Sequence, residues 1–136
     1  MDVLIVDDEM DLCSILSLIC LRKQFTVSCA HSLLDAFVQI ESHPKLMFLD
    51  NNLSDGLGLE VIFQFKQRSP RTKIAFITAC DDQKIKNQAI ARGADYFLAK
   101  PFQLQGVREI LSLMQENKIK PLPEVSYLPN WVNMGK

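Results

Sequence analysis

Near its amino end the chain reads Val3-Leu4-Ile5-Val6-Asp7-Asp8, four apolar residues that run into two carboxylates. An apolar run that ends in a polar group recurs three times further along. These runs are Leu46-Met47-Phe48-Leu49 before Asp50, Ile74-Ala75-Phe76-Ile77 before Thr78, and Tyr96-Phe97-Leu98-Ala99 before Lys100. Such runs suit buried parallel strands, whose carboxyl ends meet at one edge of a sheet. We therefore expect these polar groups to converge on one crevice.

Helical patterns separate the strands. Apolar residues at helical spacing predict helices from near Asp8 to Lys23, at about 33–40, 59–65 and 82–92, and from about 102 to 116. A further strand at 25–29 alternates apolar and polar residues, which is typical of a half-exposed edge strand. The alternation of strand and helix predicts an α/β fold with a doubly wound five-stranded parallel sheet in the order 2-1-3-4-5. This is a flavodoxin-like (βα)5 three-layer sandwich.

The apolar positions also predict which helix faces are buried. We expect inward side chains at Leu12, Ile15, Leu16 and Ile19 in the first helix and at Leu104, Val107, Leu111 and Met114 in the last. The second helix is formed by Leu33, Leu34, Phe37, Val38 and Ile40 and the third by Leu59, Ile62, Phe63 and Phe65, while the fourth has few apolar anchors beyond Ile85, Ala89 and Ile90. In the first helix this leaves an outward strip of Met10, Leu18 and Leu21. In the last helix it leaves Leu113 outward, where it would permit a dimer.

The composition limits the class of protein. With 136 residues, 48% of them hydrophobic and 23% charged, the chain is expected to be a soluble globular protein with a single core. A net charge of −1 gives no electrostatic reason to expect nucleic-acid binding. The longest apolar stretch, Leu12 to Leu21, is too short to span a bilayer, and no signal peptide precedes the first strand, so we expect a cytoplasmic protein.

Four cysteines lack the C-x-x-C spacing of zinc or redox sites: Cys13, Cys20, Cys29 and Cys80. We interpret them as buried thiols.

Residues 117–136 contain three prolines and no sustained apolar period, which predicts a tail or linker after a domain at 1–116. That tail is too short for an output domain. Two alternatives remain: a domain that acts by itself through binding partners, or the front part of a longer protein.

The predicted crevice is suited to phosphoryl chemistry. Three carboxylates that lie close together repel one another, and a divalent cation relieves that repulsion. Oxygen ligands favour Mg²⁺, with Mn²⁺ as an alternative, over zinc. Lys100 adds a positive charge opposite the acids. Asp50 is the candidate nucleophile because it ends the central strand, and Thr78 is placed to donate to a phosphoryl oxygen.

Several segments together resemble the receiver domain of bacterial two-component response regulators. They are Leu4-Ile5-Val6-Asp7-Asp8-Glu9, Phe48-Leu49-Asp50, Leu53-Ser54-Asp55-Gly56-Leu57-Gly58-Leu59-Glu60, Ile77-Thr78-Ala79, Gly93-Ala94-Asp95 and Lys100-Pro101. The resemblance covers about residues 1–116. It implies a signalling module and phosphoprotein, not an enzyme that turns over an external substrate.

The resemblance also implies roles for individual residues. Asp50 would accept a phosphoryl group from a phosphohistidine on a histidine kinase or phosphotransfer domain. The metal would be bound directly by Asp8, Asp50 and the backbone carbonyl of Asn52, and through water by Asp7. Thr78, Lys100 and the Ala79 amide would hold the phosphoryl oxygens. The Lys100–Pro101 bond would be cis. The output would pass through the surface of the fourth helix, fifth strand and fifth helix, to an effector protein, a homodimer or a further output domain.

Two positions depart from the family pattern. Ser54 stands where proline is common. Phe97 stands where a tyrosine often acts as the switch residue, so we expect Thr78 and packing at Phe97 to carry the switch. Tyr96 should face the other side of the sheet.

Two other functions share part of this pattern. An aspartate-nucleophile phosphatase of the dehalogenase-like class also uses aspartate, magnesium, threonine and lysine. That class has a second aspartate two residues after the nucleophile, where this chain has Asn52. A flavodoxin-like cofactor binder is opposed by the acidic Asp7-Asp8-Glu9 loop, which would repel a flavin phosphate.

Overall fold

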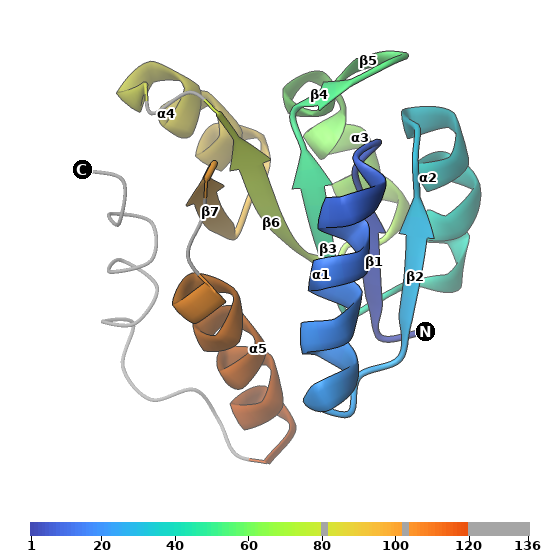
Figure 1. Ribbon diagram of the computed structural model, residues 1–136. Coiled ribbons are helices and arrows are strands. Elements are labelled where there is room, and N and C mark those ends of the chain that lie inside the picture. Colours follow the sequence, from blue (N-terminus) through green and yellow to red (C-terminus); the bar gives the residue numbers. More distant parts are fainter. Residues whose placement is uncertain (80–81, 102–103, 120–136) are drawn as a thin grey trace.

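The computed structural model is a three-layer α/β sandwich, and it describes residues 1–79, 82–101 and 104–119. Five parallel strands form the central sheet in the order β2-β1-β3-β6-β7 (Figure 1). Their bounds are β1 Val3–Val6, β2 Val27–Ala30, β3 Leu46–Asp50, β6 Lys73–Thr78 and β7 Tyr96–Ala99. This is the predicted 2-1-3-4-5 order, and β2 is the edge strand as expected. A small antiparallel pair, β4 (Asn52–Leu53) and β5 (Gly56–Leu57), follows β3 and was not predicted.

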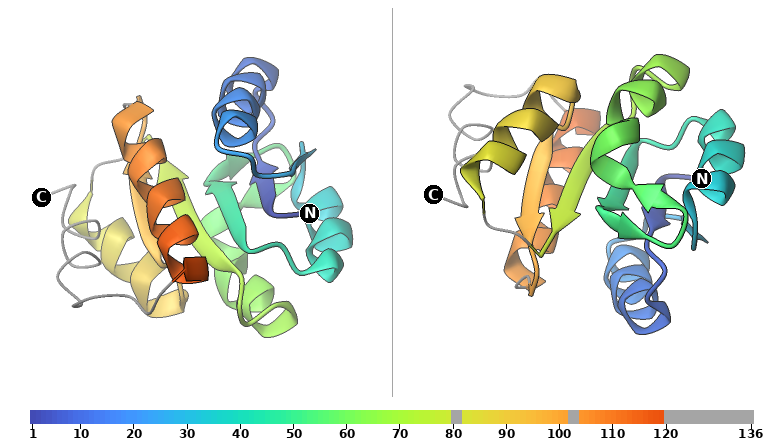
Figure 2. Two further views of the ribbon diagram at one scale, coloured as in Figure 1. Left: turned by 90° about the horizontal axis from the view of Figure 1, so that it is seen from below. Right: turned by 90° about the horizontal axis from the view of Figure 1, so that it is seen from above.

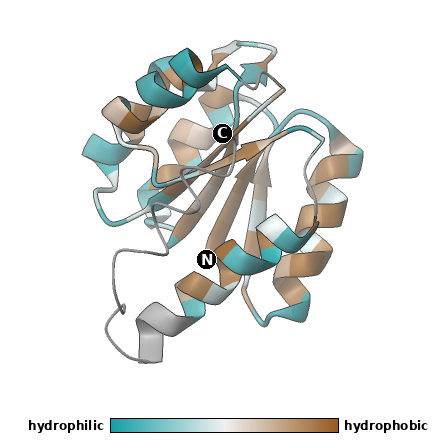
Figure 3. Cartoon of the chain, turned by 90° about the vertical axis from the view of Figure 1, so that its left-hand side faces the viewer, coloured by the Kyte–Doolittle hydropathy of each residue, from teal (hydrophilic) through white to brown (hydrophobic). Residues whose placement is uncertain are grey.

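The helices cover both faces of the sheet. One face carries α1 (Met10–Arg22) and α5 (Leu104–Ile119), and the other carries α2 (Leu33–Gln39), α3 (Ile62–Arg68) and α4 (Gln83–Arg92) (Figure 2). Two 3₁₀ turns, η1 (Ile40–Ser42) and η2 (Gly58–Val61), extend α2 and precede α3. The strands are apolar along most of their length (Figure 3). Each face of the sheet therefore has a continuous core.

Helix ends follow from local chemistry. Ser32 caps α2 by accepting a hydrogen bond from the Asp35 amide, and Asp82 caps α4 in the same way through the Lys84 amide. Gly93 ends α4 with φ of 118°, a left-handed conformation that costs glycine little, as the sequence predicts. Helix α5 continues to Ile119, three residues beyond its expected end. The rest of the predicted tail, from residue 120, lies outside the described residues.

Several predicted core positions were wrong. Ile15, Ile90 and Leu104 are exposed instead of buried. In α1 the buried residues are Cys13, Leu16, Ile19 and Cys20, whereas Ile15 lies beside this stripe and is 48% exposed. The prediction that Leu113 faces outward was also wrong. Its side chain is 4% exposed and belongs to the core between α1, α5 and the sheet. Cys13 and Cys20 are buried as expected, Cys29 is half-buried, and Cys80 lies outside the described residues.

No helix in the described part of the chain combines the length and the apolar character that crossing a bilayer requires.

Candidate functional site

Three carboxylates meet at the carboxyl edge of the sheet. Asp7 follows β1 and Asp50 ends β3, and the parallel pairing of Val6 with Leu49 brings these two strand ends together. Asp7 and Asp50 are buried, while Asp8 is exposed. Each of the three offers an oxygen, and these oxygens all lie within 4.8 Å of one another. The sequence-predicted convergence of the acids is therefore confirmed.

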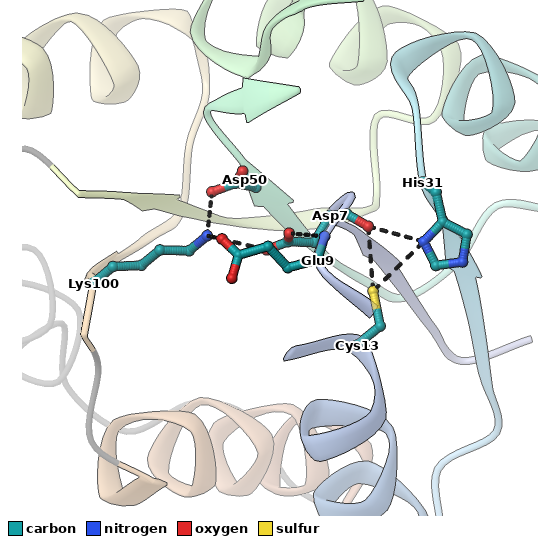
Figure 4. A network of polar contacts seen from close by, with 6 residues as sticks. All are labelled: Asp7, Glu9, Cys13, His31, Asp50 and Lys100. Atoms are coloured by element: carbon teal, nitrogen blue, oxygen red, sulfur yellow. Dashed lines mark hydrogen bonds and ion pairs between the residues drawn. The ribbon is translucent and has the colours of Figure 1, made fainter. Parts of the chain in front are cut away.

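Lys100 supplies the positive charge of the site. Its Nζ lies 3.0 Å from Asp50 Oδ1 and 3.3 Å from Asp7 Oδ2 (Figure 4). It also donates a hydrogen bond to Glu9 Oε1 at 3.1 Å. The Lys100 backbone amide bonds to the Thr78 carbonyl, and the Lys100–Pro101 bond is cis, as the resemblance implies. The Glu9 contact was not predicted from the sequence.

Burial and charge shift the protonation of these groups. Burial raises the pKa of Asp50 above its ordinary value, because the effect of desolvation exceeds that of the hydrogen bond from Lys100. Burial raises the pKa of Asp7 in the same way, against a backbone hydrogen bond from Glu9. Burial alone would lower the pKa of Lys100, but its hydrogen bond and attraction to Asp50 raise it instead. The cluster thus has excess negative charge that one ammonium does not fully compensate.

The donor set fits a divalent metal ion. Asp7 Oδ2 is buried and accepts no hydrogen bond from the described part of the chain, although Lys100 lies at ion-pair distance from it. All three acids offer hard carboxylate oxygens, the ligands that Mg²⁺ prefers. The arrangement can therefore hold such a cation.

Thr78 and Ala79 follow β6, the neighbour of β3. The pairing of Asp50 with Ile77 puts Thr78, which is buried, at the same edge of the sheet. Ala79 is exposed and shares a cavity of about 470 Å³ with Lys100 and Pro101. The structure thus brings both residues to the carboxylate cluster.

The loop after Asp50 is anchored by contacts that the sequence did not predict. Asn51 accepts hydrogen bonds from the Gly58 amide at its carbonyl and from the Leu59 amide at its side chain. A Cβ at Gly58 would lie 2.4 Å from the Asp50 carbonyl oxygen, so glycine alone permits this close approach. Asn52 begins β4 beside the site and is exposed. In the sequence, the Gly56-x-Gly58 spacing was the feature that could have indicated this tightly anchored loop.

Phe97 lies inward on the face of the sheet opposite to that of Tyr96, as the sequence predicts. Its ring centroid is 5.9 Å from that of Phe76. Lys86 of α4 places its Nζ 5.3 Å from the Phe97 centroid, and this lysine is only 1% exposed. The involvement of Lys86 was missed, because its sequence context is that of a polar surface helix.

Comparison with known proteins identifies the family. The family model described as the response regulator receiver domain matches residues 3–112. This chain belongs to the receiver domain family. The response regulator PilR of Pseudomonas aeruginosa is 34% identical over 110 residues, which are 80% of this chain and 25% of PilR. The chemotaxis protein CheY of Listeria monocytogenes is 33% identical over 110 residues, which are 79% of this chain and 92% of CheY.

Solved structures agree with the receiver fold. A two-component response regulator from Clostridium difficile superposes with a TM-score of 0.82 at 23% identity, covering 88% of this chain and 99% of that one. The beryllofluoride-activated NtrC4 receiver domain, solved as a dimer, gives 0.79 at 30% identity, with 85% and 97% covered. The chain spans about a quarter of the length of PilR. The chain thus belongs to a family of domains that serve phosphorylation-dependent signalling.

Proposed function

We propose that this receiver domain accepts a phosphoryl group on Asp50 from a phosphohistidine of a partner histidine kinase or phosphotransfer domain. The observation that supports the proposal best is the contact between Asp50 Oδ1 and Lys100 Nζ at 3.0 Å, beside two further acids. Because Lys100 Nζ contacts Oδ1 of the Asp50 carboxylate, the other carboxylate oxygen of Asp50 is available to attack phosphorus. The phosphoacceptor is thereby oriented before the donor arrives.

In this proposal Asp8, Asp50 and the Asn52 carbonyl hold Mg²⁺ directly and Asp7 holds it through water, and Mn²⁺ would serve as well. The cation supplies charge neutralisation for the transferring oxygens. Lys100 turns from the acids toward one phosphoryl oxygen, while the Thr78 hydroxyl and the Ala79 amide donate to others. The charge count supports this assignment of roles. The two positive charges of the metal and the one of Lys100 balance the three negative charges of the aspartates.

The phosphoacceptor is tested with acetyl phosphate and Mg²⁺. We expect one labile adduct on Asp50, detected by mass spectrometry, that is absent from Asp50→Asn and from wild type in excess chelator. Asp11→Asn, which changes an exposed carboxylate at the start of α1, should take up phosphate like wild type. Uptake that persists in Asp50→Asn would refute the assignment. Continuous hydrolysis of the donor without an adduct would favour the dehalogenase-like phosphatase instead.

The proposed output surface is formed by α4, β7 and α5. Phosphorylation would draw Thr78 toward the phosphoryl group, and Phe97 would repack in response against α4. Phe97 already lies inward next to Phe76 and Lys86, so the switch would proceed through packing and would not need a tyrosine hydroxyl. The recipient would be an effector protein, a second copy of the domain, or an output domain attached after the receiver. A cytoplasmic location agrees with these partners.

The kinase is proposed to dock on α1. Met10, Leu18 and Leu21 are exposed as predicted, and Ile15 extends the strip. The cavity beside Lys100 is lined by apolar side chains of α1 and of the segment that follows β7, among them Leu12, Ile15, Pro101 and Leu104. An apolar groove that leads to the phosphoacceptor suits a helical partner that carries the phosphohistidine.

A further inference from the structure

A thiol and an imidazole lie on the side of Asp7 that faces away from Lys100 (Figure 4). The Cys13 thiol donates a hydrogen bond to the Asp7 carbonyl oxygen at 3.3 Å, and His31 Nδ1 lies 3.0 Å from the same oxygen. Cys13 Sγ and His31 Nδ1 are 3.9 Å apart. The backbone of Asp7, a residue of the proposed metal site, is thus held by a cysteine on α1 and a histidine that follows β2.

A second cysteine belongs to this cluster. Cys29 of the edge strand packs against the α1–α5 core, whereas its neighbour Ala30 belongs to the core on the other face. Cys29 Sγ lies 3.5 Å from Ser17 Oγ, one helical turn beyond Cys13. Cys13 and Cys29 line one and the same cavity, between α1 and the edge strand. The two thiols are therefore neighbours.

The cluster is accessible to small molecules. A cavity of about 380 Å³ is lined by Cys13, Cys29, Ser17 and His31 together with apolar residues of α1. Cys29 is half-buried and Cys13 is 3% exposed, while Cys20, which is fully buried, does not line the cavity. A small oxidant that enters this cavity would thus meet Cys29 first and Cys13 behind it.

We propose that Cys13 and Cys29 form an oxidation site for peroxides, which closes into an intramolecular disulfide and slows phosphoryl uptake at Asp50. The second half of this statement rests on the function proposed above. Oxidation would affect phosphorylation of Asp50 through the Asp7 carbonyl oxygen, which Cys13 contacts.

The chemistry balances with hydrogen peroxide as the oxidant. The Cys29 sulfur attacks one peroxide oxygen, the O–O bond breaks, and the leaving hydroxide takes a proton to become water, which leaves Cys29 as a sulfenic acid. The Cys13 sulfur then attacks the Cys29 sulfur, the S–O bond breaks, and the Cys13 proton departs in a second water. Two thiols and one peroxide give one disulfide and two waters. Cys29 reacts first because it is the more exposed thiol.

The disulfide would change the phosphorylation site through a hydrogen bond. Oxidised Cys13 has no S–H, so the Asp7 carbonyl would lose one of the two groups that hold it. Cys13 would also be drawn toward β2, which would shift the first turns of α1 beside Asp8. Loss of a contact that orients a residue beside a metal site commonly weakens metal affinity by roughly tenfold.

The cross-link is tested by mass mapping in a Cys80→Ser background, which removes the fourth thiol. After treatment with hydrogen peroxide and alkylation, peptide mapping without reduction should show a linkage between the segments that carry Cys13 and Cys29, with loss of two hydrogens. The linkage should vanish in Cys13→Ala and Cys29→Ser and persist in Cys20→Ala. No linkage, or one that survives Cys13→Ala, would overturn the proposal.

The coupling is tested on the same samples with acetyl phosphate and Mg²⁺. Oxidised protein should take up phosphate about tenfold more slowly, and dithiothreitol should restore the rate. Cys29→Ser, which keeps a hydroxyl near Ser17, should be insensitive to peroxide. A cross-linked protein with an unchanged rate would overturn the coupling. If reduced protein takes up no phosphate at all, the proposed function fails, while the mass result still decides the oxidation site.

Discussion

At the scale of single residues, the site depends on close approaches that few side chains permit. The backbone at Gly58 passes so near the Asp50 carbonyl that any side chain would collide with it. Lys100 lies within 3.3 Å of two buried acids, so its ammonium cannot be replaced by a shorter group without losing both contacts. Small changes at these residues should therefore have large effects.

Gly58→Ala tests the close approach. A Cβ would lie 2.4 Å from a backbone oxygen, and backbone is less able to move than a flexible side chain. We expect a loss of about 3 kcal/mol in the free energy of unfolding, measured by urea denaturation. Ser54→Ala, an exposed change in the same loop, should stay within about 0.5 kcal/mol of wild type. Equal stability of the two variants would contradict the steric argument.

Asp50→Asn tests the electrostatic cost of the cluster in metal-free buffer with chelator. Because burial raises the pKa of Asp50 in the folded state, the ionised carboxylate costs stability once the pH rises above the unfolded value of 3.8. The variant should therefore melt at a higher temperature than wild type at pH 7, and the difference should vanish at about pH 3. Lys100 keeps Asp7 and Glu9 as partners. A lower melting temperature for the variant at pH 7 would reverse the sign and refute the argument.

At the scale of elements, α1 and α4 each have a face that the apolar pattern alone did not identify. In α1 the cysteines occupy the core stripe and Ile15 joins the exposed strip. In α4 the buried residues are Lys86 and Ala89, whereas Ile90 is 38% exposed. The helix that is proposed to move is thus anchored in part by the stem of a lysine over the Phe97 ring.

Lys86 should therefore matter for stability although it is a lysine on a polar helix. Lys86→Ala removes a buried stem and the cation over Phe97, and we expect a loss of about 2 kcal/mol in chemical denaturation. Lys86→Met keeps most of the stem and should stay within about 1 kcal/mol of wild type. Lys84→Ala, an exposed change on the same helix, serves as the control. Identical losses for Lys84→Ala and Lys86→Ala would mean that Lys86 is not an anchor.

Leu18→Glu tests the docking strip on α1. A charge in an apolar contact should slow phosphotransfer from a histidine kinase that phosphorylates wild type by roughly tenfold, equivalent to about 1.4 kcal/mol. Uptake from acetyl phosphate should be unchanged. Leu34→Glu, an exposed leucine on the opposite face of the sheet, should leave both rates unchanged. The docking idea fails if Leu18→Glu slows both donors equally.

At the scale of the whole molecule, the two faces of the sheet carry different functional features. The α1–α5 face carries the apolar groove and the thiol cluster, and the other face carries α4 and the inward Phe97 (Figure 2). Both meet at the carboxyl edge, where the acids lie between them. A change at this edge can therefore act on both faces at once.

Amide hydrogen exchange tests whether α4 responds. Addition of beryllofluoride and Mg²⁺ as a phosphate mimic should change the protection of residues 82–92 several-fold, because α4 has few buried anchors. Residues 33–39 of α2, which are remote from Phe97 in the sheet order, should keep their protection. Unchanged protection of residues 82–92 would argue against α4 as the moving element.

The sequence by itself determined the strand order, the receiver fold and the meeting of Asp7, Asp8, Asp50, Thr78 and Lys100. The meeting of the polar residues follows from a local rule: apolar runs form parallel strands, and parallel strands expose their last residues at one edge. The half-exposed edge strand indicated the strand order, and the resemblance of several segments to the family indicated the receiver fold. The signals are contained in short segments, so they could be found without coordinates.

Only the tertiary structure decided which side chains surround that set. His31 reaches the Asp7 carbonyl because β2 pairs with β1, and Lys86 reaches Phe97 because α4 packs over that ring. The spacing of apolar residues shows how wide the apolar face of a helix is. Which part of that face is buried depends on how the neighbouring elements pack against the helix. Contacts between residues distant in sequence depend on that packing, so Ile15, Leu113 and the thiol cluster could not be placed from the chain alone.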